Sequence, residues 1–361
     1  MSTVLQHQLQ VGASLTLGAI SLYYIYKRLA SHVADDRVHH LNKTVKSDIG
    51  STDTSDAWLE RAKLLIGDSG IQNLKDAHVL VVGMGGVGSF AAEFLVRAGV
   101  GKLTIIDGDD VDPTNRNRQL CALVSTHHKY KAPALISHVD VMKERLLDVN
   151  PAVKIEGTIL TARKGSRSDL QAALAKFLEC EECLTLIESG GFDYVVDCID
   201  SLQPKLHLMH AALKSCVPIV SSMGAGGKVD PSKVDLADIS KTDMDPFAKF
   251  IRKRLRRQFG ILSGVACVFS TEKPDPNSIK VTDGSRYKKS YYGTISYLPA
   301  VFGIHAASLV IRELGYKKKI VYTKTKRHLL KQGRSAAYNS DFLTRQRGEQ
   351  EGEQDDDEDE P

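Results

Sequence analysis

Residues 78–88, HVLVVGMGGVG, decide the fold of this chain. His78–Val82 has the composition of a short strand, and the glycine-rich run that follows it directly precedes a segment with helical spacing, Ser89–Ala98. A strand, a glycine-rich turn and a helix in this order are typical of nucleotide-binding α/β proteins, because the turn lets a phosphate approach the backbone and the helix N-terminus supplies free N–H groups. The glycines expected to line the phosphates are Gly83, Gly85, Gly86 and Gly88.

The same alternation continues on both sides of this motif. Further strands are predicted at Lys102–Asp107, Lys154–Leu160, Tyr194–Cys198 and Pro218–Ser222, and helices at Ala132–Asn150 and Pro204–Lys214, with a helical insertion at Ser166–Gly191. Strands that alternate with helices imply parallel pairing through right-handed crossovers. The predicted fold class is therefore α/β: a Rossmann-like, mostly parallel twisted sheet with helices on both faces.

Charge is distributed unevenly along the 361 residues. The net charge is +4, but the tail from Gln346 to Pro361 contains nine acids and one arginine, which leaves +12 on the rest. A basic body favours a polyanionic partner such as nucleic acid or an anionic membrane surface. The alternative is an ordinary soluble body with a solubilising tail.

The N-terminal segment Leu9–Tyr26 is almost wholly apolar and is followed by Lys27 and Arg28. It is just long enough to span a bilayer, and the basic pair predicts that the rest of the chain stays in the cytosol. A signal-like segment and a buried helix are the alternatives. The polar segment Ser31–Asp56 is expected to be a linker.

Six cysteines are scattered and indicate no disulfide framework, so a reducing compartment is expected. Cys180 and Cys183 form a single Cys-x-x-Cys pair. Structural zinc takes four ligands, usually from two such pairs. The pair is therefore expected to be two cysteines on one helix rather than a metal site.

Asp107 ends the strand that follows the glycine loop, at the right distance to accept a hydrogen bond from a ribose hydroxyl. Up to this point a nicotinamide-dependent oxidoreductase fits as well as an ATP-dependent enzyme.

The residues after Asp107 favour ATP. They comprise the run Asn115-x-x-Arg118-Gln119, then Lys131, and Asp200 after a later strand. All lie where strands end, which is where open α/β sheets bind ligands. A triphosphate needs cations for its charge and a carboxylate to hold Mg²⁺, and a nicotinamide site needs neither.

On these residues the sequence resembles the ThiF/MoeB superfamily of ubiquitin-activating-enzyme-like proteins. The resemblance implies that ATP activates a carboxylate as an acyl-adenylate, with release of pyrophosphate. It implies ATP binding by the glycine loop, Asp107, Asn115, Arg118, Gln119 and Lys131, and catalysis by Asp200, Arg118, Lys131 and Arg61, with Mg²⁺ on Asp200. Arg61 is expected to reach the ATP of the second chain in a homodimer.

One departure from the superfamily pattern precedes the lysine. His127-His128 replaces the usual Val-Gly, so Lys129 competes with Lys131 for the role at the phosphates.

A series of motifs in the second half is more specific. It consists of Ser221–Pro231, Asp245-Pro246, a basic helix, Gly260–Gly264 and Val268–Pro274. This series resembles the tRNA threonylcarbamoyladenosine dehydratases, especially their membrane-anchored eukaryotic forms. The resemblance implies ATP-dependent cyclisation of threonylcarbamoyladenosine beside the anticodon of tRNA. It also implies a single-pass protein of the mitochondrial outer membrane whose catalytic domain faces the cytosol.

The implied organisation has four parts. They are an anchor at 1–30, a linker at 31–56, an adenylation domain with a C-terminal tRNA-binding part at 57–325, and a basic-then-acidic tail at 326–361.

The basic helix carries six cations within nine residues, with Phe247, Phe250, Ile251 and Leu255 between them. The apolar residues are expected to pack inward while the cations face tRNA phosphates. The alternative is a solvated helix face. The cations are Lys249, Arg252, Lys253, Arg254, Arg256 and Arg257.

Three other functions remain open from the sequence. Activation of a ubiquitin-like or sulfur-carrier protein C-terminus would need a nucleophilic cysteine, for which Cys267 is the candidate, but Ala266–Phe269 has the pattern of a buried strand. The others are an NAD(P)-dependent oxidoreductase and a membrane-tethered RNA-binding scaffold.

Overall fold

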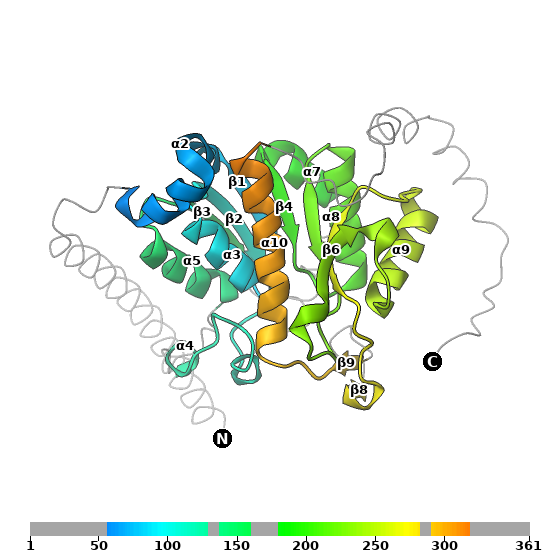
Figure 1. Cartoon of the computed structure of the whole chain (residues 1–361). Helices are drawn as coiled ribbons and strands as arrows, with labels where there is room; N and C mark the ends of the chain where they lie inside the picture. The colour runs from blue at the N-terminus through cyan, green and yellow to red at the C-terminus, as the bar shows by residue number, and fades with distance from the viewer. Residues whose placement is uncertain (1–55, 129–136, 160–179, 282–289, 318–361) are drawn as a thin grey trace, which may run out of the picture. The chain divides into compact units, whose positions relative to one another are not determined.

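A seven-stranded sheet of order β3-β2-β1-β4-β5-β7-β6 organises the chain (Figure 1). Every neighbouring pair is parallel except β6 and β7. The strand order reverses between β1 and β4, and in open α/β sheets the crevice at such a point binds the ligand. The strands are β1 His78–Val82, β2 Lys102–Asp107, β3 Lys154–Ile159, β4 Tyr194–Asp197, β5 Ile219–Ser222, β6 Val234–Asp238 and β7 Ala266–Ser270.

The computed structural model describes residues 56–128, 137–159, 180–281 and 290–317. The chain divides after Trp58, and the sheet belongs to the unit that begins at Leu59. The expected membrane helix, the linker, Lys129, Lys131 and the C-terminal tail lie outside the described residues.

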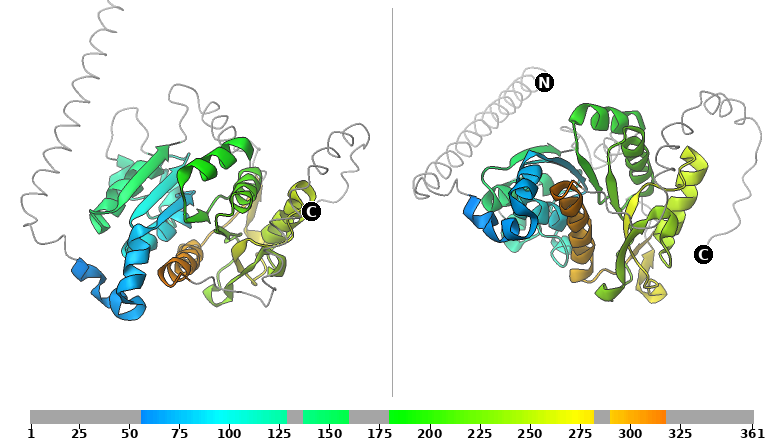
Figure 2. Two further views of the ribbon diagram at one scale, coloured as in Figure 1. Left: turned by 90° about the horizontal axis from the view of Figure 1, so that it is seen from above. Right: turned by 45° about the horizontal axis from the view of Figure 1, so that its top comes forward.

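Helices cover both faces of the sheet (Figures 1 and 2). Val79 and Val81 of β1 belong to one hydrophobic cluster, and Leu80 and Val82 belong to the other. Both sets are buried, as expected for parallel strands covered on two sides. The first face carries α2 Glu60–Asp76, α3 Gly88–Arg97, α5 His138–Val149 and α10 Tyr297–Gly315, and the second carries α7 Cys180–Gly190, α8 Leu202–Lys214 and α9 Pro246–Phe259.

The predicted mostly parallel α/β sheet is thus confirmed, and the five strands predicted with it begin and end within one residue of β1–β5; the antiparallel strand β6 was not predicted. Helix α10, which packs on the sheet beside α3, was not among the helices predicted from the sequence. The remaining elements are the hairpin β8 Ile279–Val281 and β9 Ser290–Tyr292, helix α4 Val124–His128, and the 3-10 turns η1 Asp56–Leu59, η2 Pro113–Asn115, η3 Pro231–Lys233, η4 Ile239–Lys241 and η5 Pro276–Ser278.

Within the described residues, α10 is the one helix long and apolar enough to cross a membrane. Leu298, Phe302, Leu309 and Val310 of this helix have no exposed surface. The apolar character of α10 therefore reflects its place in the protein core.

Candidate functional site

The glycine loop lies between β1 and α3, against the end of β4. Gly83 has a φ of +92°, and a Cβ there would lie 2.8 Å from the Cys198 carbonyl oxygen. A Cβ on Gly88 would lie 1.7 Å from the Gly83 carbonyl oxygen. Both positions therefore require glycine. The loop also touches the segment that leads two residues later to Asp200.

Asp107 joins the glycine loop to the segment after β2. Its Oδ2 accepts a hydrogen bond from the Met84 N–H, and its Oδ1 accepts one from the Asp109 N–H at 2.6 Å. The side chain is 9% exposed. The carboxylate is thus fixed at the edge of the loop, as a group that receives a ribose hydroxyl must be.

A residue that the sequence did not single out lies beside this carboxylate. His138, at the start of α5, places its Nδ1 3.3 Å from Asp107 Oδ1, and its side chain is 1% exposed. Burial lowers the pKa of His138, but the adjacent Asp107 carboxylate and the charges of Asp109 and Asp110 raise it by more, so the net shift is upward.

The Asn115–Gln119 turn lies against the glycine loop. The Asn115 carbonyl accepts hydrogen bonds from the N–H groups of Arg118 and Gln119, at 3.0 and 2.9 Å. A Cβ on Gly86 would lie 3.2 Å from Arg118 Cγ, and one on Gly85 would lie 3.6 Å from Gln119 Nε2. The turn and the loop therefore form one surface.

Asp200 is exposed just beyond β4, on a turn held by a buried ion pair. Asp197 Oδ1 accepts from the Ile199 N–H at 3.0 Å, and Asp197 Oδ2 lies 2.6 Å from both Lys205 Nζ and Ser221 Oγ. Lys205 and Asp197 have no exposed side-chain surface. This network, which the sequence did not reveal, fixes the backbone that presents Asp200.

The described residues do not connect Lys131 or Arg61 to this surface. Lys131 lies outside the described residues, and His127-His128 ends α4 just before them. Arg61 is exposed on α2, and no contact in the described part of the chain connects it to the glycine loop. The first half of the site therefore consists of the loop, Asp107, the Asn115–Gln119 turn and Asp200.

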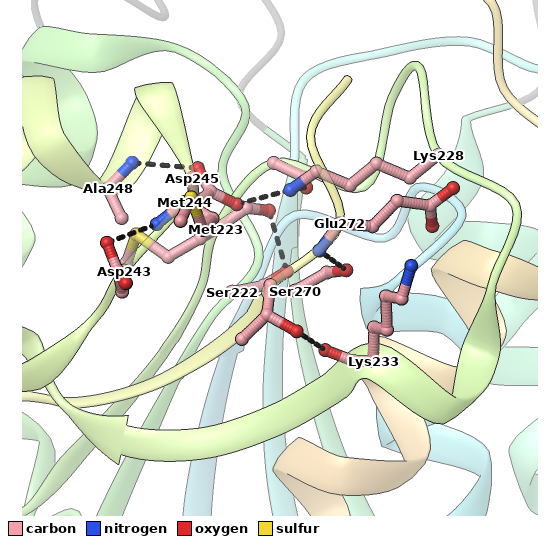
Figure 3. A network of polar contacts seen from close by, with 12 residues as sticks. Ser222, Met223, Lys228, Lys233, Asp243, Met244, Asp245, Ala248, Ser270 and Glu272 are labelled. Carbon is pink, nitrogen blue, oxygen red and sulfur yellow. Dashed lines mark hydrogen bonds and ion pairs between the residues drawn. The ribbon is translucent and has the colours of Figure 1, made fainter. Parts of the chain in front are cut away.

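A second glycine-rich loop, Gly224–Val229, follows β5 at the same edge of the sheet. Lys228 Nζ lies 2.6 Å from Asp245 Oδ2 and donates to the Gly224 carbonyl at 2.9 Å (Figure 3). Both side chains are 1% exposed. Asp245 also accepts from the Ala248 N–H at 2.9 Å, which makes it the N-cap of α9. One buried ion pair thus fastens this loop to the start of the basic helix.

The segment 293–297 lies between the second loop and the nucleotide half of the site and contacts both. Asn117 Nδ2 donates to the Thr294 carbonyl at 3.0 Å. One residue before Thr294, the Gly293 carbonyl accepts from the Gly227 N–H at 2.8 Å. Tyr297 Oη donates to the Val229 carbonyl, also at 2.8 Å. The two halves therefore lie along one continuous edge.

Helix α9 presents most of its cations to solvent. Ala248, Ile251 and Leu255 face the core, and α9 ends at Gly260 in the left-handed conformation. Five of the six predicted cations are exposed: Lys249, Lys253, Arg254, Arg256 and Arg257.

Two predictions about α9 were wrong. Arg252 is half-buried, and its guanidinium donates to the carbonyls of Ile239 and Thr242, so it supports η4 rather than facing solvent. Phe250 does not pack inward: it is 45% exposed, and the Arg254 guanidinium lies 5.4 Å from its ring centroid. Phe250 lies about 200° round the helix from Ala248, which places it on the outer face.

The buried cysteines in the described part of the chain lack the exposure or the low thiol pKa that a nucleophile needs. Cys267 has no exposed surface, and burial raises the pKa of its thiol well above its usual range. Burial raises the pKa of Cys121 to about 12, helped by Asp107. The helix predicted to carry the Cys-x-x-Cys pair is α7, in which Cys183 is buried.

Across the described ranges, no group of three or more His, Cys, Asp or Glu side chains could hold a metal.

Comparison with known proteins identifies the family. The ThiF family model matches residues 59–345, which span the whole edge described above. The chain belongs to the ThiF family. Its relatives include the tRNA threonylcarbamoyladenosine dehydratase of Bacillus subtilis, 39% identical over 70% of this chain and 93% of the relative. The Escherichia coli dehydratase is 35% identical over 72% of this chain and 95% of the relative.

A crystal structure of the E. coli dehydratase in complex with ATP has a similar fold. Its TM-score is 0.55 at 34% identity, and the similarity covers 73% of this chain and 97% of that one. The ThiF assignment and the ATP complex of this relative agree with the geometry of the glycine loop.

Proposed function

We propose that this ThiF-family chain is an ATP-dependent tRNA threonylcarbamoyladenosine dehydratase. The observation that carries the proposal is the continuous edge on which the glycine loop, Asp107 and Asp200 lie beside the second loop and the basic helix α9. An adenylating site next to a cationic face suits a substrate that is both a carboxylate and a nucleic acid. Two curated dehydratases that match this chain over more than nine-tenths of their own length support it.

The residues of the first half have separate roles in this proposal. The glycine loop receives the phosphates, Asp107 accepts from the ribose, and Asn115 and Gln119 complete the nucleotide surface. Arg118 and Lys131 neutralise phosphate charge. Asp200 would hold a magnesium ion, which would balance the charge of the leaving pyrophosphate.

The chemistry has two steps. An oxygen of the threonyl carboxylate attacks the α-phosphorus of ATP, and pyrophosphate leaves. The carbamoyl nitrogen of the same nucleoside then attacks the activated carbonyl carbon, loses its proton, and AMP leaves as the ring closes. The second step is fast because both groups belong to one molecule. The net loss is one water, and no acyl-enzyme is needed.

This intramolecular route agrees with the state of the cysteines. Activation of a protein C-terminus as a thioester requires a thiolate, and Cys267 is buried with a raised pKa. An NAD(P)-dependent oxidoreductase would leave Arg118 and Asp200 without a role. A membrane-tethered RNA-binding scaffold would not need the glycines at positions 83 and 88.

The outer face of α9 binds tRNA in this proposal. Lys249, Lys253 and Arg256 form one stripe along the helix, and Arg254 and Arg257 form the next. Phe250 is exposed on the second stripe, beside Arg254, and its ring offers a surface on which an unpaired base of the anticodon loop stacks. Contacts to phosphates supply affinity, and stacking favours a single-stranded loop over a duplex.

A homodimer is also proposed. Leu64 and Leu65, on the same turn of α2 as Arg61, are 83% and 80% exposed. Large apolar side chains as exposed as these favour burial against another protein surface. Arg61 would then reach the nucleotide of the second copy.

We further propose that residues 1–30 anchor the protein in the mitochondrial outer membrane. The linker 31–56 would connect the anchor to the catalytic part, 57–325, in the cytosol, followed by the charged tail 326–361. The apolar run Leu9–Tyr26 and the pair Lys27-Arg28 support this arrangement.

Pyrophosphate release tests the proposed activity. Purified protein with ATP and Mg²⁺ should release pyrophosphate when tRNA carrying threonylcarbamoyladenosine is added. The same tRNA lacking the modification is the matched control and should give background release. Equal release with both tRNAs, or release only with a protein carrying a free C-terminus, would contradict the proposal.

A further inference from the structure

His138 is buried against the carboxylate on which the nucleotide site depends. Its Nδ1 lies 3.3 Å from Asp107 Oδ1, and 1% of its side chain is exposed. Neither ring nitrogen makes a hydrogen bond of good geometry within the described residues. A buried imidazole without hydrogen bonds is costly unless a nearby charge compensates it, and Asp107 supplies that charge.

The backbone holds His138 in this position. Its N–H donates to the Asp109 carbonyl at 3.1 Å, and the preceding residue, Ser137, pairs with Asp110 in an isolated bridge. Ser137 Oγ also caps α5 by accepting from the Asp140 N–H at 3.1 Å. The first turn of α5 is therefore fastened to the segment that follows Asp107.

Asp107 now has three contacts from three parts of the chain. Its two oxygens accept from the N–H groups of Met84 and Asp109, and His138 lies beside Oδ1. The other titratable groups that act on this pair are Asp109, Asp110 and the thiol of Cys121. The carboxylates favour a protonated His138, and Cys121 stays neutral because its pKa is raised to about 12.

We infer that His138 is a positioning residue for the nucleotide: as an imidazolium beside Oδ1 it holds the Asp107 carboxylate in the orientation that receives the ribose hydroxyls. The inference rests on the proposed nucleotide role of Asp107. His138 itself does not touch the reacting atoms. His138 raises nucleotide affinity only through its contact with Asp107.

A double-mutant cycle with full-length protein tests this role. His138→Leu fills a similar volume without a donor, and His138→Asn keeps a donor near the position of Nδ1. Titration calorimetry with AMP should show about a tenfold weaker Kd for His138→Leu, about 1.4 kcal/mol, and a smaller loss for His138→Asn, which keeps a donor but not the charge. In an Asp107→Asn background, His138→Leu should weaken AMP binding no further.

The pH dependence of nucleoside binding gives a second readout. Because the pKa of His138 is raised in the folded protein, the contact with Asp107 is complete below the ordinary histidine range and disappears as pH rises through the raised pKa. Adenosine is the probe, since it has a ribose but no phosphate that titrates. Its affinity for the wild type should fall across this window, and its affinity for His138→Leu should stay flat.

The outcomes distinguish the positioning role of His138 from the proposed function of the protein. Additive effects of His138→Leu and Asp107→Asn, or a pH profile shared by wild type and His138→Leu, would overturn the positioning role. A wild-type protein that binds neither AMP nor ATP would instead refute the proposed function. Urea unfolding of each variant identifies a loss of affinity caused by misfolding. If a variant misfolds, the pH dependence of adenosine affinity in the wild type becomes the test of the positioning role of His138.

Discussion

Replacing Lys228 by methionine should destabilise the protein strongly, because it leaves Asp245 charged and buried. Lys228 Nζ is 2.6 Å from Asp245 Oδ2, and both side chains are 1% exposed. Removing one partner of a buried pair typically costs about 3–5 kcal/mol. Removal of the hydrogen bond to the Gly224 carbonyl is part of that cost. We expect the free energy of unfolding to fall by about 4 kcal/mol.

The double variant Lys228→Met/Asp245→Asn should recover part of this stability. Asparagine is as good an N-cap as aspartate, so the bond from the Ala248 N–H survives, and no unpaired charge remains. The coupling between the two substitutions should be about 2 kcal/mol. The matched control is Lys233→Met, whose pair with Asp230 is 3.6 Å apart and exposed, and which should cost less than about 1 kcal/mol.

Urea unfolding followed by circular dichroism measures the wild type, Lys228→Met, Asp245→Asn, the double variant and the Lys233→Met control. The start of α9 should loosen in Lys228→Met, so tRNA affinity should fall while AMP affinity stays close to wild type. If Lys228→Met costs no more than Lys233→Met, or if the cycle is additive within about 0.5 kcal/mol, the buried pair does not hold the second loop to α9.

Four further predictions concern the proposed activity. Asp200→Asn should keep the fold but lose most pyrophosphate release, because a neutral amide binds Mg²⁺ poorly; wild-type release from this variant would remove Asp200 from the mechanism. Mixing Arg61→Ala with Asp200→Asn chains should restore up to about a quarter to a half of the activity through mixed dimers, and mixed dimers without recovery would refute the shared site. The double variant Lys253→Gln/Arg256→Gln should lower the slope of log K for tRNA binding against log salt concentration by roughly one unit for each phosphate that is no longer neutralised. Arg252→Gln should instead mainly lower stability. Equal slopes in the wild type and the double variant would show that α9 is only a solvated helix face. A chain beginning near Ser55 should be active in solution and absent from the membrane fraction of cells, and a truncated chain still bound to membranes would contradict the N-terminal anchor.

The strands and the glycine loop were predictable because their signals are local. A five-residue apolar run followed by a tight glycine turn has few alternatives, and the glycines at positions 83 and 88 prove sterically necessary. The placement of Asp107 and Asp200 at one edge was predictable because Asp107 ends β2 and Asp200 closely follows β4, and the carboxyl ends of parallel strands lie together.

The supporting residues were not predictable in the same way. Lys205 and His138 are polar residues in helices, and their burial depends on what packs against them from distant parts of the sequence. Helix α10 approaches the nucleotide loop at Gly303, where a Cβ would lie 2.4 Å from the Val87 carbonyl, but nothing within its own sequence indicates that contact.

The rotation of α9 shows the limit of composition alone. All of its apolar residues were expected to face inward, yet the inward stripe is Ala248, Ile251 and Leu255. This stripe turns Phe250 outward and brings Arg252 against Thr242. The period of the helix decides which side chains face solvent: it places the Phe250 ring on the outer face and turns Arg252 away from it.

Mass spectrometry of tRNA nucleosides from cells that lack this protein tests the central claim most directly. We expect threonylcarbamoyladenosine to accumulate in its open form and the cyclic form, lighter by one water, to disappear. Wild-type protein should restore the cyclic form, and Asp200→Asn should not. An unchanged amount of the cyclic nucleoside in the deficient cells would contradict the assignment of this chain as the dehydratase.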